Sequence, residues 1–292
     1  MDFSARNAPA LCRRAFSLAL AGMFITSVAR AAAPAAPPEL AQIAKPEAAE
    51  AARLVEQFRS AGVQGDFYLE FQLKVLPRRG DERAYDGRLW GGRRAGAPVF
   101  RVEVTDSSGA AHRLLLRNGA APRAWRWRDG RAVSIEGRDA LAPLVPGADI
   151  SAFDLQMPFL YWPGATVERI TRVWGRPANA FLFRAPELIG EGDGAVAAVR
   201  AYLDTQFNAL MQTELIGPAG RVIKTSYLVS LKKVEDQQVP RQMDYRNEVT
   251  RDKTRLDVTA VALNAAWPAT LFEPETLGEA GAAPARVNRF AP

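Results

Sequence analysis

Residues 65–75, GDFYLEFQLKV, alternate between apolar and polar side chains over a full strand length. In a β-strand every second side chain lies on the same face, so this pattern gathers the apolar residues on one face of a sheet. They are Phe67, Leu69, Phe71, Leu73 and Val75. The sequence therefore predicts an antiparallel strand with one face on a core and the other toward water.

Similar patterns follow along the chain, separated by turn signals such as Asn118-Gly119 and Asp129-Gly130. We expect strands at 84–91, 98–105, 111–118, 123–128 and 132–136, and again at 166–174, 179–185, 196–203, 207–216, 221–234, 238–249 and 254–263. Long helical patterns do not alternate with these strands, so a parallel sheet is not expected. The fold class predicted is mainly β, with a single curved antiparallel sheet that forms an unclosed β-barrel and a few helices on its concave face.

Helical spacing is confined to short parts of the chain. Ala51, Leu54, Val55 and Phe58 recur at i, i+3, i+4 and i+7 and predict a helix from about Pro46 to Ala61. Near the end of the sequence, residues 268–277 favour one short helical turn.

The middle of the chain, residues 137–163, lacks the strand alternation and is rich in proline. Its last part, DLQMPFLYWP (Asp154–Pro163), carries large apolar side chains and a single charge. We expect short helical turns near 137–145 and 151–157, with Ser151 capping the second. This apolar insert separates the two sets of strands.

The N-terminus has the pattern of an export signal. Arginines at positions 6, 13 and 14 precede an apolar run, Ala15–Val28, and the small residues of Ala29-Arg30-Ala31 form a cleavage site. The segment CRRAFSL resembles a twin-arginine signal without its usual Leu-Lys ending, so Sec export stays equally open. Removal of the signal also removes Cys12, the only cysteine, and leaves a chain without disulfides.

These patterns predict a periplasmic protein with a simple domain order. We expect a signal peptide at 1–31, a linker at 32–45, one β-domain at 46–278 and a loose tail at 279–292. The net charge of the whole sequence, +6, is mild and does not by itself indicate a nucleic-acid partner.

The sequence offers little for catalysis. His112 is the only histidine, and it lies in a predicted strand beside Leu114 and Leu116, where a structural role is favoured. A hydrolytic site would need His112 exposed beside a serine and a carboxylate. Zinc would have to be held almost entirely by carboxylates, so we expect no metal, no cofactor and no enzymatic activity.

The segment PRAWRWRDGR (Pro122–Arg131) mixes arginine with tryptophan, a composition that also occurs where proteins bind nucleic acids or anionic lipids. Trp125 and Trp127 share one face of this predicted strand, and Arg126 and Arg128 share the other. We therefore favour a strand whose arginine face is exposed to water.

Four stretches of the sequence, within residues 65–277, resemble the LolA-like family of outer-membrane lipoprotein-sorting proteins. They are FDLQMPFLYWP (153–163), ERITRVWGRPANAFLFRAP (168–186), VRAYLDTQFNALMQTELIGPAGRVIKTSYL (199–228) and VPRQMDYRNEVTRDKTRLDVTAVALN (239–264). One departure is that Ala201-Tyr202-Leu203-Asp204 stands where the family usually has Trp-Val-Asp. The resemblance implies an unclosed β-barrel around a hydrophobic cavity, helices that act as a lid, and binding of acyl chains in the periplasm.

The resemblance and the apolar pattern together predict a ligand-binding cavity and lid. Its predicted residues are Phe58, Phe67, Leu69, Phe71, Phe100, Val102, Leu114, Leu116, Trp125, Leu155, Met157, Phe159, Tyr161, Trp162, Phe181, Phe183 and Met211. The alternative is that the aromatic residues of the insert plug the barrel as ordinary core.

Two functions follow from these expectations. The first is a periplasmic carrier that moves lipids or lipoprotein acyl chains toward the outer membrane. The second is a periplasmic sensor or a transporter-accessory module of the same fold. For the carrier we expect a monomer whose partners are a lipid or an acylated lipoprotein and an inner-membrane transporter. We also expect transient contact with a membrane surface and no binding of nucleic acid.

Overall fold

The computed structural model describes residues 44–119 and 121–291. The predicted signal peptide, and all but the last two residues of the predicted linker, lie outside these ranges. Contacts assign the described residues to one compact unit. Within them, no helix is long and apolar enough to span a membrane.

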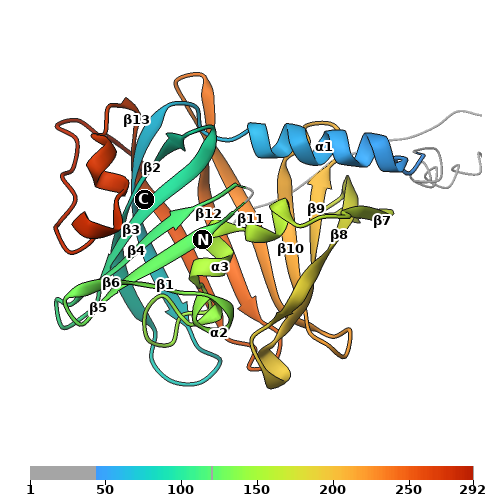
Figure 1. Ribbon diagram of the computed structural model, residues 1–292, viewed down its shortest axis with the longest axis horizontal. Helices are drawn as coiled ribbons and strands as arrows, with labels where there is room; N and C mark the ends of the chain where they lie inside the picture. The colour runs from blue at the N-terminus through green and yellow to red at the C-terminus, as the bar shows by residue number, and fades with distance from the viewer. Residues whose placement is uncertain (1–43, 120, 292) are drawn as a thin grey trace, which may run out of the picture. The chain divides into compact units, whose positions relative to one another are not determined.

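A single antiparallel sheet of 14 strands forms the described domain (Figure 1). Its order is β6-β5-β4-β3-β2-β1-β13-β12-β11-β10-β9-β8-β7, with β14 attached to β13. The strands are β1 (Asp66–Leu76), β2 (Arg83–Arg94), β3 (Ala97–Thr105), β4 (Ala111–Arg117), β5 (Arg123–Arg128), β6 (Arg131–Ser134), β7 (Thr166–Val173), β8 (Arg176–Ile189), β9 (Val196–Asp204), β10 (Leu210–Ile216), β11 (Val222–Val234), β12 (Gln237–Asn247), β13 (Lys253–Ala265) and β14 (Asn288–Arg289). The predicted mainly β, unclosed sheet is confirmed.

Two hairpin meanders make up this sheet, and the pairing of β1 with β13 joins them. The first runs from β1 to β6 and the second from β7 to β13, so that β6 and β7 are the two outer edges. Figure 1 shows the sheet curving around the segment that connects those edges. We call this connecting segment, residues 135–165, the insert; it contains the apolar stretch 137–163 noted in the sequence. The face of the sheet toward it is the concave face.

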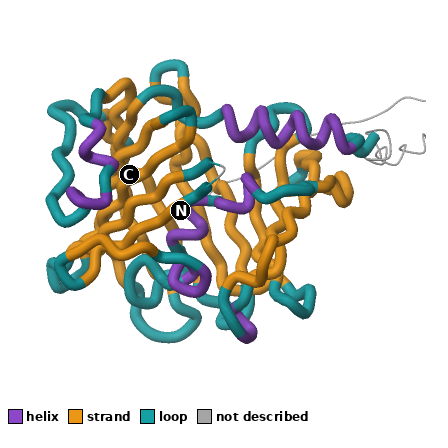
Figure 2. Tube along the Cα trace, in the orientation of Figure 1, coloured by secondary structure: helices purple, strands orange, loops and turns teal. Residues whose placement is uncertain are grey.

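Helices are few and short, as Figure 2 shows in purple. They are α1 (Ala48–Ser60), α2 (Gly137–Leu141), α3 (Ala152–Gln156), η2 (Pro158–Tyr161), η3 (Gly192–Gly194), η4 (Ala269–Phe272) and η5 (Pro274–Thr276). The predicted first helix, the helical turns of the insert and the turn near 268–277 are all present. Ala51 and Val55 of α1 are buried against the sheet and the insert, as their helical spacing predicted.

Two glycines of β2 allow large rings to lie flat on the concave face. Gly87 is paired with Phe71, and Gly91 with Phe67. A Cβ at either glycine would lie 2.3 Å from the ring of its partner, which is shorter than real contacts allow. The aromatic ring therefore takes the space of the missing side chain on the neighbouring strand.

The residues after β13 return over the convex face. Phe272 and Leu277 are buried there among Tyr68, Trp90 and Leu115. Four arginines on the sheet donate hydrogen bonds to carbonyl oxygens of this C-terminal segment, residues 266–291; they are Arg94, Arg101, Arg113 and Arg117. This C-terminal segment is held because its own apolar side chains and carbonyls complete a face that the pattern of β1 alone predicts to be wet.

Candidate functional site

The insert enters the concave face through a well-capped helix. Ser151 precedes α3 and forms a capping box with Asp154: the Asp154 Oδ2 accepts a hydrogen bond of 2.8 Å from the Ser151 N–H. The helix ends at Met157, which has a left-handed conformation with φ of 52°. Pro158 then begins η2, because its ring suits a first helical turn but not the interior of a longer helix. These local signals orient the backbone so that the apolar side chains after Met157 point toward the concave face.

An aromatic cluster fills the half of the concave face formed by β7–β10. The ring of Phe159 lies 5.5 Å from that of Phe183 on β8 and 6.2 Å from that of Phe153. Trp162 packs on the same group, and Phe58 of α1 lies against it. The insert thus supplies part of the apolar side chains that form the core on this half of the concave face.

The other half of the concave face is filled by the first part of the insert. Its residues Leu144, Val145, Ala148 and Ile150 are buried against β1–β4, β12 and β13. The sheet side of this contact includes several predicted cavity residues, namely Leu69, Phe71, Phe100, Val102, Leu114 and Leu116.

A polar network fixes the insert to the sheet from inside. The Lys224 Nζ on β11 donates to Asp154 Oδ2 at 2.6 Å and to the Asp149 carbonyl at 3.1 Å. The Gln156 side chain donates to the carbonyls of Arg117 and Arg123 at 2.8 and 2.9 Å. Helix α1 is attached similarly, because the Asn208 side chain donates to its Leu54 carbonyl at 2.7 Å.

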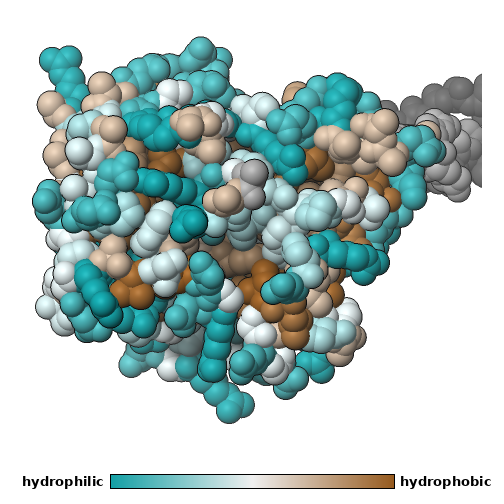
Figure 3. All heavy atoms as spheres, viewed as in Figure 1, coloured by the Kyte–Doolittle hydropathy of each residue, from teal (hydrophilic) through white to brown (hydrophobic). Residues whose placement is uncertain are grey.

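The space left between the insert and the sheet differs from one end of the domain to the other. Beside Phe153, Phe159 and Tyr245 an enclosed space of about 10 Å³ is left, which is at most enough for one water molecule. A larger pocket of about 330 Å³ lies at the end of the domain that holds α2 and η3, and Ile150, Ile223 and Lys224 are among its lining residues. In Figure 3 hydrophobic residues show as several separate patches, one of them near the lower centre of the visible face, within a mostly hydrophilic surface.

Burial shifts the pKa values of ionisable groups near the insert, among them Asp149 and Tyr245. Burial raises the pKa of the Asp149 carboxyl group above its usual range, and its Oδ2 has no hydrogen-bond partner among the described residues. Burial also raises the pKa of the Tyr245 hydroxyl. In both cases the cause is loss of contact with water, which disfavours the charged form.

Nearly all predicted cavity residues meet the insert or line the concave face. Phe58, Met157, Phe159, Tyr161, Trp162, Phe181 and Phe183 share one cluster, Leu155 packs in the other, and Phe67 lies 6.4 Å from Phe100. This arrangement brings the predicted residues together, and ligand binding by them stays a prediction.

Trp125 and Met211 are exceptions, because both lie on the convex face. Trp125 is paired with Leu115, whose neighbours Leu114 and Leu116 are the ones that face inward. It therefore packs beneath the C-terminal segment, in the cluster that also holds Trp127. Met211 packs with Tyr202 on the outer side because the β9–β10 pairing shifts register between Leu210 and Gln212.

One arginine of β5, Arg126, is less exposed than the predicted wet face would have it. Arg126 is paired with Leu114, so it points toward the insert, where its Nη2 donates to the Pro143 carbonyl at 3.2 Å. Burial lowers the pKa of its guanidinium group. The sequence pattern identified the two faces of β5 correctly, and Arg128 is exposed as predicted, but Arg126 is half-buried against the insert.

His112, near the start of β4, contacts a preceding turn, and the group resembles a catalytic triad only in composition. Its Nε2 is 2.9 Å from Asp106 Oδ2, and the Ser108 hydroxyl donates to Asp106 Oδ1 at 2.6 Å. A hydrolytic triad needs the histidine between the serine and the carboxylate. Here the carboxylate lies between them and also accepts the Ser108 and Ala110 N–H groups, as expected of a turn-stabilising aspartate. Within the described ranges, no group of three or more His, Cys, Asp or Glu side chains is placed to hold a metal ion.

Several site residues were not predicted from the sequence. Lys224, Gln156 and Asn118 hold the insert in place. They lie in a strand, a helix and a turn respectively, where a polar residue by itself gives no sign of a special role. The Ser151–Asp154 cap was the one polar contact with a local signal. The partners of the others are more than 30 residues away in sequence, so no local pattern reveals them.

Comparison with solved structures relates this architecture to known proteins. A DUF1329 family protein from Desulfovibrio piger superposes with a TM-score of 0.66 at 12% identity, covering 78% of this chain and 97% of the other. A putative outer membrane lipoprotein-sorting protein domain from Vibrio parahaemolyticus gives 0.66 at 14% identity, with 77% and 97% covered. A LolA superfamily protein from Nitrosomonas europaea gives 0.58 at 14% identity, with 76% and 97% covered.

The sequence itself matches no protein-family model and no curated protein. The structural likeness extends over three quarters of the chain and almost the whole of each similar structure. The described part of this chain therefore has the LolA-like fold.

Proposed function

We propose that this protein is a periplasmic carrier that binds acyl chains of lipids or lipoproteins on the concave face of its sheet and moves them toward the outer membrane. The observation that carries the proposal is the insert: the apolar concave face is occupied by side chains of a single connecting segment, which joins two sheet edges and is not itself a strand of the sheet. The fold shared with a putative lipoprotein-sorting domain supports the same conclusion.

In this proposal the insert and an acyl chain compete for the same surface. Because only about 10 Å³ is free beside Phe159, an acyl chain reaches this half of the concave face only when insert side chains leave it. Burial of a long acyl chain yields on the order of 10 kcal/mol at about 0.8 kcal/mol per methylene. Burial of Phe153, Phe159 and Leu160 contributes about 1.5–3 kcal/mol each. The two sums are similar, so the exchange is reversible, as a carrier requires.

The carrier acts by binding and release, without a covalent step. Its proposed partners are an acylated lipoprotein or lipid, an inner-membrane transporter that delivers it, and a membrane surface touched in passing. Export by the N-terminal signal places it in the periplasm, where it works as a monomer.

A lipid-loading experiment tests the proposal. The protein is purified from a periplasmic fraction and its mass is measured under native conditions, before and after incubation with a fluorescent dipalmitoylated cysteinyl peptide. We expect bound lipid that is released on denaturation. The variant Asp154→Asn, which weakens the attachment of the insert, should load faster than the wild type.

Asp244→Asn provides the matched control, because Asp244 forms an ion pair of 2.7 Å with Arg255 outside the concave core. It should load at the wild-type rate. If wild type and Asp154→Asn both keep a clean apo mass, the carrier proposal is wrong.

A second function is favoured by the tight packing beside Phe153, Phe159 and Tyr245. A sensor or transporter-accessory module needs no free cavity there, and an aromatic cluster packed by the insert suits it. A protein that binds no lipid but co-purifies with an envelope transporter or another membrane protein would support this alternative.

A further inference from the structure

The sheet contains a window between β12 and β13. Their ladder covers only Gln242–Arg246 and Lys253–Asp257, although both strands continue beyond it. On the far side of the gap, the Asn264 side chain of β13 donates to Glu235 in the turn between β11 and β12 at 3.3 Å. Along the separated part, β13 still pairs with β1 on its other edge.

The C-terminal strand β14 occupies this window. Asn288 is paired with Val261 and Arg289 with Ala260, and the Phe290 N–H donates to the Thr259 carbonyl at 2.8 Å. The pairing is therefore that of an added strand on the free edge of β13, extending over only two residue pairs.

The side chains of this strand point to opposite sides of the sheet. Phe290 passes inward and packs against two buried clusters, one that includes Val258 and one that includes Val239 and Val261. The Arg241 guanidinium lies 5.5 Å from its ring centre. Arg289 points outward, where its Nη1 lies 2.7 Å from Glu70 Oε2. The window thus recognises an aromatic side chain inside, a basic side chain outside and a main chain between them.

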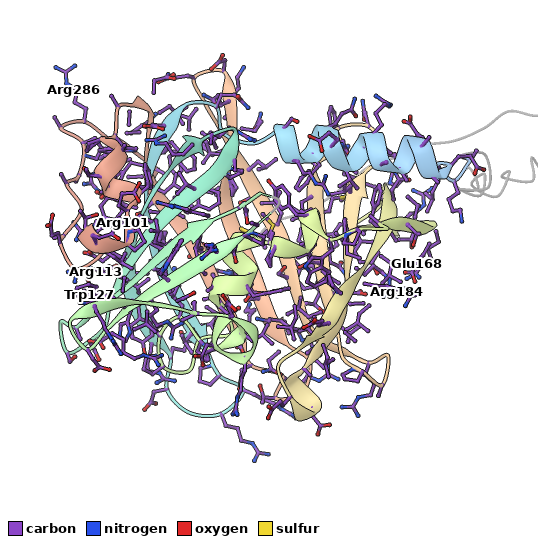
Figure 4. The ribbon with its side chains drawn as sticks, viewed as in Figure 1. Arg101, Arg113, Trp127, Glu168, Arg184 and Arg286 are labelled. Atoms are coloured by element: carbon purple, nitrogen blue, oxygen red, sulfur yellow. The ribbon has the colours of Figure 1, made fainter. Side chains whose placement is uncertain are left out.

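The residues that connect β14 to the anchored part of the C-terminal segment are mostly exposed. Upstream, Phe272 and Leu277 are fully buried and Arg101 binds their neighbouring carbonyls. Between that anchor and β14, most of residues 282–286 are exposed, and Arg286 projects away from the protein in Figure 4. Strand β14 can therefore leave the window while the anchored part stays in place.

We propose that the window between β12 and β13 is a strand-addition site for an extended segment of a partner protein that carries a basic residue followed by an aromatic one, and that residues 288–290 occupy it as an internal competitor. The partner peptide pairs with the edge of β13 at Thr259–Val261. Its aromatic side chain takes the place of Phe290, and its basic side chain takes the place of Arg289 beside Glu70.

Binding of a peptide in trans tests this proposal. The probe is a fluorescein-labelled peptide with the sequence of residues 284–292, PARVNRFAP, and the readout is fluorescence anisotropy with the full chain. Phe290→Ala removes the aromatic anchor of the internal competitor, so this variant should bind the probe about tenfold more tightly than the wild type. A peptide with alanine in place of its phenylalanine should not bind.

A reversible lock provides the second arm. Ala260 and Arg289 form a non-hydrogen-bonded antiparallel pair, in which Cβ atoms approach closely enough for a disulfide. In a Cys12→Ser background, Ala260→Cys with Arg289→Cys should lose probe binding on oxidation and regain it on reduction. The proposal would be overturned if the probe bound equally to wild type, Phe290→Ala and the oxidised lock. It would also be overturned if the probe bound neither Phe290→Ala nor the reduced lock. Uptake of a fluorescent fatty acid by Phe290→Ala without peptide binding would overturn it in favour of a lipid window.

Discussion

Lys224 and Asp154 form an ion pair of 2.6 Å between β11 and the insert, with only 15% and 5% of the two side chains exposed. The same Asp154 oxygen accepts hydrogen bonds from the Ser151 N–H and hydroxyl groups. One carboxylate therefore both caps α3 and attaches the insert to the sheet.

Substitution of Lys224 by methionine should destabilise the protein strongly. The change leaves the Asp154 charge buried without its partner, a loss of about 3–5 kcal/mol in the free energy of unfolding. Urea denaturation measures it. Lys232→Met, at an exposed position of the same strand, should change stability by less than about 0.5 kcal/mol. Similar small losses for both variants would show that the ion pair does not hold the insert.

Phe159→Ala tests the aromatic cluster. The ring is 2% exposed and lies between Phe153 and Phe183, so its removal leaves a cavity and should cost about 3–5 kcal/mol. Phe207→Ala is the matched control, because 66% of Phe207 is exposed, and it should cost much less. Equilibrium unfolding of both variants decides. A loss at Phe159 no larger than at Phe207 would place the ring outside the core.

Arg101→Met should release the C-terminal segment locally. The buried guanidinium donates to the carbonyls of Leu271, Thr276, Leu277 and Glu279, which would lose their donor. We expect amide hydrogens of residues 268–282 to exchange at least about tenfold faster while those of α1 are unchanged. Arg184→Met, at an exposed position labelled in Figure 4, should leave both regions as in the wild type. Uniform acceleration across the domain would instead indicate global destabilisation.

Asp149→Asn should stabilise the protein near neutral pH. Because burial raises the pKa of Asp149 in the folded state, the folded protein binds its proton more tightly than the unfolded chain does. The contribution of this group to stability is thus largest below the ordinary aspartate pKa of about 3.9 and falls as pH rises through the raised folded value. Thermal unfolding at pH 7 should show a higher midpoint for Asp149→Asn than for wild type, and the difference should shrink toward pH 3. A lower midpoint at pH 7 would mean that the charge of Asp149 stabilises the insert through Lys224.

The strands could be predicted from the sequence because each carries its own period and its own turn signals. The first helix and the Ser151 cap are equally local features, and both are present. The exposure of each face could not be predicted in the same way. Tyr68 is on the polar-patterned face of β1 but is fully buried, since residues far along the chain return to cover it.

The same reason explains the misplaced site residues. Trp125 is apolar and lies in a strand, as do the residues that line the concave face. Only its pairing with Leu115 assigns it to the convex face. The placement of Met211 depends on a register shift in the pairing of β9 with β10, and no turn residue in the sequence predicts that shift. The attachment of the insert by Lys224 joins positions 70 residues apart, beyond the range of any periodic pattern.

The pairing of β1 with β13 has a consequence for how the chain folds. Phe71 is opposite Val258, so the strand that begins the sheet finds its second neighbour only near the end of the chain. Pairing over such a sequence distance is slow, because the loop between the strands must be ordered before the contact forms. Until then both meanders expose an apolar strand edge, and the folding rate should depend on β13 more than on any hairpin within either meander.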